Sequence, residues 1–502
     1  MYRQAEPSSI TPEKFEFPLS GQLSPDNRWV IMAELIPWSE FEAEYEKNFS
    51  PKMGAPAKPF RMALGALIIK EKLGTSDRET VEQIRENPYL QYFLGMPAYS
   101  NEAPFEPSMF VHFRQRIGID LVNQVNEKMV KKARESQSTE EPSQKKKESE
   151  EVIKTKNLGK LLADATCTPA DIRYPNDLGL LNEARRQTEK ILDRLWQSGR
   201  NRFGDKPRTY RKKARKDYLK VARKRRPTLR ERRVAIDKQL QDLNRNLSSI
   251  EKLVNAGVSL INLSQKKYKH LLVCAEIYRQ QQWMFSNETS RIDHRIVSLT
   301  QPHIRPIVRG KAGNPVEFGA KLAVSCFESY VFLDRLSWDN EDESLDLQVQ
   351  IEHYQELTGY YPESVHVDKI YRTRQNRAWC KERGIRLSGP PLGRPPKNVS
   401  KETQKQAQLD ERIRNEIEGK FGQGKRRYGL ARIMAKLRET SETAIAISFL
   451  VINLSTLLRQ VYWIFLWIFS PFCKFAFIFR LLIIRAYVKH LIVQKKLIFV
   501  AS

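Results

Sequence analysis

The chain has 502 residues and carries 86 lysines and arginines against 59 aspartates and glutamates, a formal net charge of +27 at pH 7. This length allows about three domains with separate cores. So large a positive excess attracts polyanions, which leaves nucleic acid or an anionic membrane surface as the fitting partner classes. The five cysteines are scattered without a CxxC pair, so neither a disulfide scaffold nor a cysteine-based zinc site is expected. Residues 1–25 are polar and include acidic residues, which is not the pattern of a secretory signal.

Residues 1–135 predict a compact, all-helical domain. Phe60–Leu73 is apolar at helical spacing and stops at Gly74. Ser76 followed by Glu79 is a capping-box pattern that opens a second helix, and Ser108 opens a third. Short helices with tight turns and basic residues resemble a helix-turn-helix in outline, so the domain is a candidate for binding DNA ends. An ordinary helical bundle fits the same pattern.

Residues 136–157 are charged and poor in apolar residues, so we expect a flexible linker there. The apolar run 158–165 then predicts a buried strand, the first part of a core made of residues 158–175 and 301–435.

Between the two parts of this core, residues 176–300 predict a basic helical insertion. Residues 202–233 hold 16 lysines and arginines against three acids, with aromatic residues among them. This density favours contact with a nucleic-acid backbone, although a solvated, disordered arm is the usual reading of a charge block. Residues 236–284 follow with apolar residues spaced as a coiled-coil-like seam, from Leu240 to Val254. The candidate DNA-binding residues of the insertion are Arg211, Lys212, Lys213, Arg223, Lys224, Arg225 and Arg226.

From residue 301 onward the pattern alternates between strands and helices. Strands are expected at 316–324, 328–338, 364–368 and 385–387, with helices at 342–357, 373–383 and 400–419. With the strand at 158–165, this order predicts a mixed sheet flanked by helices, of the α+β or α/β class.

Three acidic residues fall at the ends of these expected elements. Asp164 is expected to close the first strand and Asp368 the fourth, and Glu418 is expected near the end of the last helix. Carboxylates at the ends of neighbouring strands can converge, and three hard oxygen donors suit Mg²⁺. Two such ions could activate a nucleophile and stabilise a leaving oxygen in a phosphodiester displacement. Chance placement remains the simpler explanation on spacing alone, because the chain holds 59 acids.

Several longer segments carry a resemblance. They are NRWVIMAELIPWSEFEAEY (27–45), RMALGALIIKEKLG (61–74), SDRETVEQIRENPYLQYFLG (76–95), LLADATCTPADIRYPNDLGLLNEAR (161–185), VHVDKIYRTRQNRAWCKERGI (365–385) and EIEGKFGQGKRRYGLARIMAKL (416–437). Together they resemble a DDE transposase of bacterial insertion sequences, in the superfamily that includes groups four and five. The resemblance implies an RNase H-like catalytic core, a divalent metal and recognition of terminal inverted repeats. It also implies cleavage and strand transfer of DNA.

Carried over residue by residue, the resemblance makes Asp164, Asp368 and Glu418 the catalytic and metal-binding triad. In the family's Tyr, Arg, Glu, Lys signature, Arg414, Glu418 and Lys425 match, but Glu411 stands at the tyrosine position. Gly422 and Gly424 are expected to end the helix, which would place Lys425 in a loop as a phosphate contact. Arg414, one turn before Glu418, would lean on that carboxylate or reach a phosphate, and surface charge is the simpler reading of both basic residues. His366 should share a face with Asp368 and could support the metal site, although a buried, hydrogen-bonded histidine is the favoured reading.

The resemblance further implies two Mg²⁺ ions, with Mn²⁺ as the alternative, and a homodimer on double-stranded DNA without a small-molecule substrate. We expect a cytoplasmic, nucleoid-associated bacterial protein. Residues 436–502 predict a C-terminal helix and an apolar tail, in which Pro471 and Lys474 favour packing over a membrane span for 460–502. The rival functions are a metal-dependent nuclease without strand transfer, a catalytically silent nucleic-acid-binding protein and a tail-anchored membrane protein.

Overall fold

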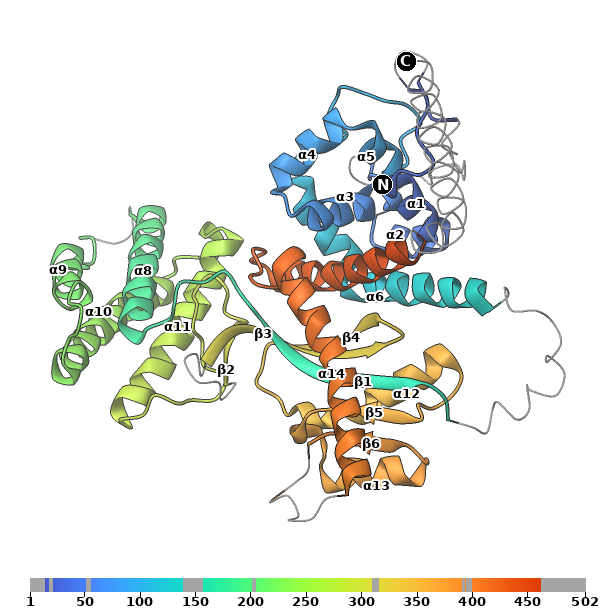
Figure 1. Cartoon of the computed structure of the whole chain (residues 1–502). Coiled ribbons are helices and arrows are strands. Elements are labelled where there is room, and N and C mark those ends of the chain that lie inside the picture. The colour runs from blue at the N-terminus through green and yellow to red at the C-terminus, as the bar shows by residue number, and fades with distance from the viewer. Residues whose placement is uncertain are drawn as a thin grey trace, which may run out of the picture.

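The computed structural model describes residues 14–17, 21–50, 56–138, 157–200, 205–308, 316–390, 393 and 400–461. Figure 1 shows a group of N-terminal helices above a sheet and its flanking helices, with a separate helical unit extending to one side. The mixed sheet with helices around it confirms the α+β class at this coarse level.

The N-terminal helices are α1 (Arg28–Leu35), α2 (Glu42–Glu46), α3 (Phe60–Leu73), α4 (Asp77–Glu86), α5 (Pro88–Phe93) and α6 (Met109–Ser138). Two predicted boundaries are confirmed. Gly74 caps α3 with φ of 68°, a left-handed conformation that glycine adopts without strain. Ser76 caps α4, since its hydroxyl accepts a hydrogen bond of 3.2 Å from the backbone N–H of Glu79.

Helix α6 starts next to Ser108, as predicted, and continues past Gly118, where the backbone turns to φ 71° and ψ 171°. Glycine permits this kink at low cost. The helix reaches Ser138, into the segment expected as a linker. Residues 139–156 of that segment lie outside the described residues.

The sheet consists of β1 (Lys160–Pro169), β2 (Arg305–Val308), β3 (Val316–Phe327), β4 (Tyr330–Ser337), β5 (Ser364–His366) and β6 (Arg386–Ser388). Its order is β2-β3-β1-β5-β6, with β4 also paired to β3. Strand β3 runs antiparallel to its neighbours, whereas β5 runs parallel to β1 and to β6. Around it lie α12 (Leu347–Thr358), α13 (Arg374–Glu382) and α14 (Lys401–Arg427).

Several predicted strand boundaries are wrong. Strand β1 continues to Pro169 because Ala165 through Pro169 pair with Ala323 through Gly319 of β3, so Asp164 lies inside the strand and does not close it. Strand β3 extends to Phe327, and Glu328 and Ser329 form the following turn with φ of 49° and 66°. Strand β2 has no counterpart among the predicted elements. In each case, pairing with a distant segment sets the boundary.

The helix Arg438–Val461 packs between the N-terminal helices and the sheet, and most of it is buried. Asn453 marks the contact: its amide nitrogen donates to Val331 O (2.7 Å) and Asn126 Oδ1 (3.0 Å), and its amide oxygen accepts from Val331 N (2.8 Å). By length and apolar composition alone, this helix could cross a membrane. Its burial is that of a core helix. The predicted apolar tail lies outside the described residues beyond Val461.

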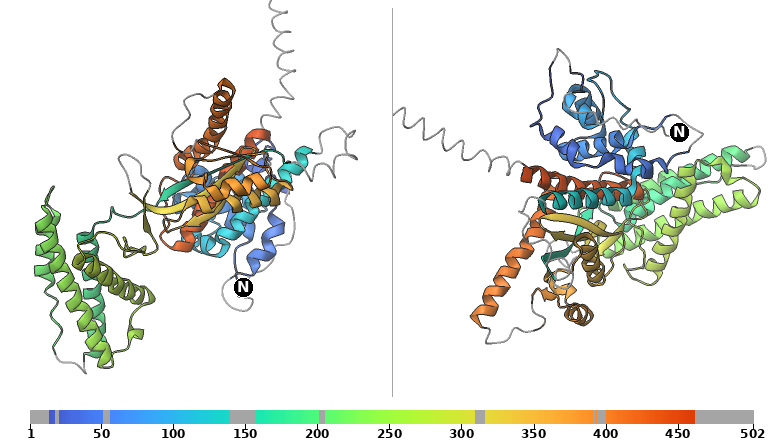
Figure 2. Two further views of the ribbon diagram at one scale, coloured as in Figure 1. Left: turned by 90° about the horizontal axis from the view of Figure 1, so that it is seen from below. Right: turned by 90° about the vertical axis from the view of Figure 1, so that its right-hand side faces the viewer.

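In the described part of the predicted insertion, the α-helices are α8 (Asp177–Gly199), α9 (Arg211–Ala222), α10 (Leu229–Asn255) and α11 (Gln265–Ser286). In Figures 1 and 2 this unit projects away from the sheet. The predicted seam is confirmed in α10, where Leu240, Leu243, Ile250 and Leu253 are buried against α8 or α11 in two apolar clusters. Residues 236–284 form two helices, because α10 ends at Asn255 and α11 begins at Gln265.

Candidate active site

Asp164 lies in the middle of β1, half-buried at the centre of the sheet. It pairs with Val324 of β3 on one side. Its Oδ1 accepts a hydrogen bond of 2.8 Å from the backbone N–H of Ala165. A central strand therefore fixes the position of this carboxylate.

Asp368 lies two residues after β5. The predicted strand, which ended at Asp368, was therefore two residues too long. The carboxylate caps the short helix η6 (Lys369–Tyr371), since its Oδ1 accepts a hydrogen bond of 2.7 Å from the backbone N–H of Lys369. Capping thus holds Asp368 at the carboxyl end of the strand.

The sheet brings these two aspartates to corresponding positions. In the parallel ladder of β1 and β5, Leu162 is paired with His366. Asp164 and Asp368 each follow that pair by two residues, and neighbouring strands lie about 4.8 Å apart.

The charge of Asp368 also acts on Asp164. Burial raises the pKa of Asp164 to about 6, the Ala165 N–H and Arg414 oppose the rise, and the negative charges of Asp368 and Glu343 add to it. Negative charge crowded at one sheet edge is the condition in which a bound cation is stabilising.

Glu418 comes from α14, which crosses the sheet (Figure 1). The helix is pinned to the sheet eight residues earlier, where Asp410 accepts hydrogen bonds from Arg386 (2.7 and 3.0 Å) and Ser388 (2.6 Å) of β6. The Glu418 side chain is 51% exposed, and its Oε1 lies 3.0 Å from Nη1 of Arg414. The predicted contact between Arg414 and Glu418 is present.

The three acids match a divalent ion in donor chemistry, and the negative charge of Asp368 acts on Asp164. As the side chains stand, no three His, Cys, Asp or Glu side chains within the described ranges are grouped closely enough to hold a metal. Glu418 is paired with Arg414, whose positive charge also acts on Asp164. Arg414 is therefore a cation that Glu418 and Asp164 share.

His366 is 1% exposed and lies on the sheet beneath α14. Its Nε2 is 3.1 Å from Ser364 Oγ, and its Nδ1 is 3.7 Å from Asp410 Oδ1. Burial lowers the pKa of His366 to about 4, so the ring is neutral near pH 7. This is the buried, hydrogen-bonded histidine that the sequence favoured.

Lys425 lies in the last turn of α14, so its predicted place in a loop is wrong. The helix continues through Gly422 and Gly424. A side chain at Gly424 would meet Leu430 Cδ1 at 2.7 Å and Ile452 Cδ1 at 3.2 Å. This glycine permits close packing against the C-terminal helix and does not end α14.

Two further residues beside the aspartates were missed by the sequence analysis. Glu343 follows β4 in a short helical turn, and its Oε1 lies 3.0 Å from Lys321 Nζ. Its negative charge contributes to the raised pKa of Asp164. Tyr371, three residues after Asp368, is fully buried, and its hydroxyl has no hydrogen-bond partner in the described part of the chain. Two sequence signals could have pointed to Glu343 and Tyr371. They are the acidic segment 339–346 and the presence of a tyrosine three residues after Asp368.

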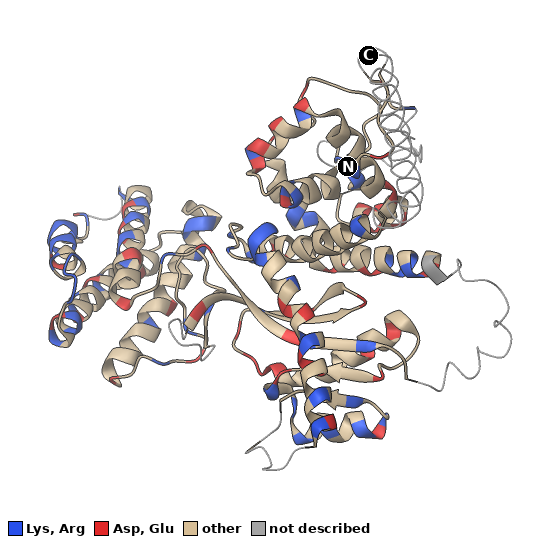
Figure 3. Cartoon of the chain, in the orientation of Figure 1, with Lys and Arg blue, Asp and Glu red and all other residues tan. Residues whose placement is uncertain are grey.

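The candidate DNA-binding residues of the insertion lie at its far end, on α9 and in the turn before α10 (Figure 3). All seven are exposed. Two of them are also in ion pairs, Arg211 with Asp193 at 2.8 Å and Lys224 with Glu231 at 2.5 Å. The remaining five project charge to the solvent.

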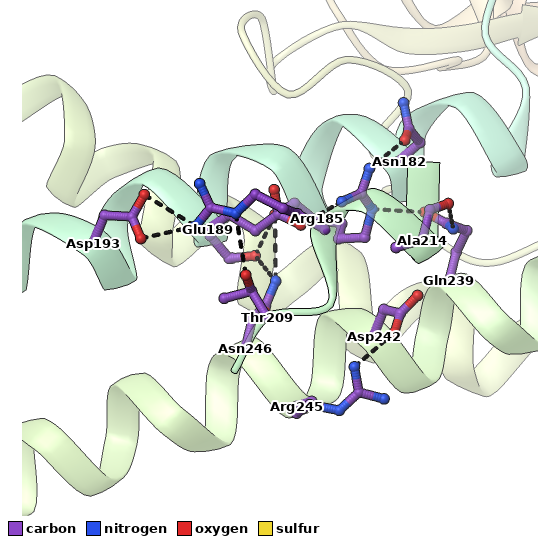
Figure 4. Close-up of polar contacts among 12 residues, drawn as sticks. Asn182, Arg185, Glu189, Asp193, Thr209, Ala214, Gln239, Asp242, Arg245 and Asn246 are labelled. Atoms are coloured by element: carbon purple, nitrogen blue, oxygen red, sulfur yellow. Dashed lines mark hydrogen bonds and ion pairs between the residues drawn. The ribbon is translucent and has the colours of Figure 1, made fainter. Parts of the chain in front are cut away.

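A buried polar network holds α9 in place against α8 and α10 (Figure 4). Arg185 of α8 is 1% exposed; it forms an ion pair with Glu189 and donates to Gln239 of α10 (3.1 Å). Gln239 in turn donates to the backbone carbonyl of Ala214 in α9 (3.2 Å). The helix that carries much of the positive charge is thereby fixed to the insertion core.

Asp164 within β1, Asp368 just after β5 and Glu418 on α14 form the acid set of a candidate enzyme of the nuclease and transposase class. Comparisons with known proteins agree. Residues 365–455, which include Asp368 and Glu418, match the family model of a transposase DDE domain. Residues 17–116 match that of a transposase domain, DUF772.

The chain is also 29% identical over 182 residues to the uncharacterized protein ORF8 in the nfe locus of Rhizobium meliloti, across 36% of this chain and 81% of that protein. No solved structure matches. The family matches confirm the predicted resemblance to a DDE transposase of insertion sequences: both matched segments are transposase domains by their family models, and that family implies DNA as the partner and normally uses a divalent metal.

Proposed function

We propose that the protein binds the terminal inverted repeats of an insertion sequence and cleaves and joins DNA at a site formed by Asp164, Asp368 and Glu418. The observation that carries the proposal is the register of β1 and the parallel strand β5, because Asp164 and Asp368 each follow the pair of Leu162 and His366 by two residues. The transposase DDE match over 365–455 supports the assignment of the second aspartate and the glutamate.

Asp164, Asp368 and Glu418 would hold two Mg²⁺ ions, or Mn²⁺ in their place. When bound, such a pair supplies Lewis-acid stabilisation to the attacking and leaving oxygens of an in-line displacement. The protein's own contribution is placement. The central strand fixes Asp164, the η6 cap fixes Asp368, and the Asp410 contacts fix the helix that delivers Glu418. Arg414 and Lys425 would bind phosphate oxygens of the DNA end.

We further propose that the core is RNase H-like. Its support is the strand order around β1: antiparallel β3 and β4 on one side, and parallel β5 and β6, joined through α13, on the other. Both aspartates then follow the paired residues Leu162 and His366 of two neighbouring parallel strands at the centre of the sheet.

DNA binding outside the catalytic site is assigned to the insertion, with the N-terminal helices contributing to recognition of the ends. Five of the seven candidate DNA-binding residues of the insertion have no ion pair among the described side chains. A duplex that lies across them would release counterions, and its affinity would fall steeply with salt. Because two transposon ends need two active sites, we propose a homodimer on DNA, in a cytoplasmic, nucleoid-associated location.

The test is an in vitro reaction with the full-length chain, Mg²⁺ and a labelled duplex that carries the DNA flanking the coding region. Cleaved ends and joined products are expected with the wild type. Asp164→Asn, Asp368→Asn and Glu418→Gln should each abolish both products. Glu402→Gln, which removes an exposed charge from the same helix as Glu418, serves as the matched control and should leave both intact.

Each rival function gives a different outcome. Cleaved but never joined ends would identify a nuclease without strand transfer. Binding of the duplex without any metal-dependent product, unchanged by the three substitutions, would identify a silent nucleic-acid-binding protein and contradict the proposal.

A further inference from the structure

Arg414 is held at both ends of its guanidinium group. Its Nη1 lies 3.0 Å from Glu418 Oε1, and its Nη2 lies 3.0 Å from Glu411 Oε1. The side chain is only 15% exposed, although both glutamates are about half exposed. Glu411 and Glu418 lie one turn before and one turn after Arg414, which places all three on one face of α14.

The same guanidinium acts on Asp164. Its charge opposes the rise in the pKa of Asp164 that burial causes, and the charge of Asp164 acts on Arg414 in return. Arg414 is therefore a fixed cation that compensates carboxylates from β1 and from α14.

Glu411 gives this chain a particular version of the arrangement. It stands where the family signature has a tyrosine, and it supplies a second carboxylate for the guanidinium. The planar fork of arginine can bind two carboxylates at once, which a lysine ammonium on a single stem does less well.

We propose that Arg414 is the resident counter-ion of the catalytic carboxylates and competes with the divalent ion for Glu418. Loading of the metal requires the guanidinium to release Glu418, and a DNA phosphate is the anion that can take the guanidinium over. Arg414 is thus a positioning residue that couples DNA binding to metal binding. This inference rests on the proposed function, because it takes Glu418 as a metal ligand.

Two cations cannot occupy one carboxylate without repulsion, so each ion pair that must break weakens the binding of the metal. Glu418 is exposed enough to rotate, and the long stem of Arg414 allows its charged end to move while α14 stays pinned at Asp410. By reciprocity, whatever DNA does to the affinity for metal, metal does to the affinity for DNA.

The experiment measures Mn²⁺ binding to the full-length chain by isothermal titration calorimetry in the absence of DNA. Arg414→Gln is expected to bind Mn²⁺ roughly fivefold more tightly than the wild type, the size expected when one partly exposed ion pair no longer has to break. Arg414→Lys should fall between the two. Arg412→Gln removes the same charge from an exposed position on the same helix and should change the affinity by less than about twofold.

A second arm repeats the titration with a short duplex present. The duplex should tighten Mn²⁺ binding more in the wild type than in Arg414→Gln, because only the wild type has a guanidinium to transfer to a phosphate. Melting temperatures in EDTA confirm that each variant is folded, and Arg414→Lys provides the same test if Arg414→Gln does not fold.

The outcomes separate the two proposals. Unchanged or weaker Mn²⁺ binding by folded Arg414→Gln overturns the counter-ion role while the metal site stands. A wild type that binds no Mn²⁺, with or without DNA, overturns the proposed function itself.

Discussion

Replacing His353 with glutamine should destabilise the protein and remove part of the pH dependence of its stability. His353 lies on α12 between two acids from other elements. Its Nδ1 is 2.9 Å from Asp334 Oδ1 of β4, and its Nε2 is 3.3 Å from Glu127 Oε1 of α6. Burial disfavours the charged ring, but the hydrogen bonds to Asp334 and Glu127 outweigh it and raise the pKa of His353 to about 10. The charged histidine therefore joins the N-terminal helices to the core.

The magnitude follows from the shift in pKa. A rise from 6.5 to about 10 corresponds to at most about 5 kcal/mol of unfolding free energy, at about 1.4 kcal/mol per pKa unit. The Glu127 side chain is 35% exposed, so solvent screens its part, and about 2–3 kcal/mol is a realistic value. Because the folded state holds the proton more tightly, this stability is complete below the unfolded pKa and is lost as the pH rises through 10.

Denaturant unfolding near pH 6 and near pH 10 measures the effect. The wild type should lose about 2–3 kcal/mol between these conditions relative to His353→Gln, which should be less stable near pH 6. His112→Gln, at an exposed position on α6, is the control and should behave as the wild type. Equal pH dependence in wild type and His353→Gln would refute the charged bridge.

Three other sets of substitutions test separate parts of the structure. Glu189→Gln removes the carboxylate that pairs with the buried Arg185, so the chain should lose about 3–5 kcal/mol of stability by chemical denaturation, and a loss below about 1 kcal/mol would contradict the buried ion pair. Gly424→Val should lower the free energy of unfolding by about 1–3 kcal/mol, because its Cβ would meet Leu430 at 2.7 Å. Gly419→Ala, which has open space around it, should be neutral or slightly stabilising. Equal thermal stability of the two variants would show that Gly424 is not a packing position. The third set replaces four exposed basic residues of the insertion with glutamine: Lys212, Lys213, Arg225 and Arg226. These substitutions should reduce the log–log salt slope of DNA binding by about 0.9 for each phosphate that is no longer neutralised. An unchanged slope, measured by fluorescence anisotropy, would show that the insertion is not part of the DNA interface.

The sequence predicted elements that local chemistry determines. The caps at Ser76 and Thr373 and the left-handed Gly74 mark helix ends where they were expected, because each is satisfied within a few residues of the chain. The end of β1 and the existence of β2 were not predictable in the same way. Both depend on pairing with β3, which begins more than 150 residues after β1 begins.

The candidate site shows the same division. Motifs proposed Asp164, Asp368 and Glu418 as candidates, and the one-turn spacing of Arg414 and Glu418 allowed the contact that the structure shows. The second contact of Arg414, with Glu411, depends on the side-chain conformations on α14. The proximity of Glu343 to Asp164 depends on how the helical turn after β4 lies near β1 in the folded chain. Gly424 was misread because its neighbour Ile452 comes from a helix that packs on α14 only in the folded chain.

The most direct test of the central claim is the anomalous scattering of Mn²⁺ in crystals of the protein bound to duplex DNA. The account predicts a peak in contact with both Asp164 and Asp368, and a second peak about 3.5–4 Å away that is shared with Glu418. Peaks at other residues, or carboxylates of Asp164 and Asp368 that bind no common ion, would contradict it.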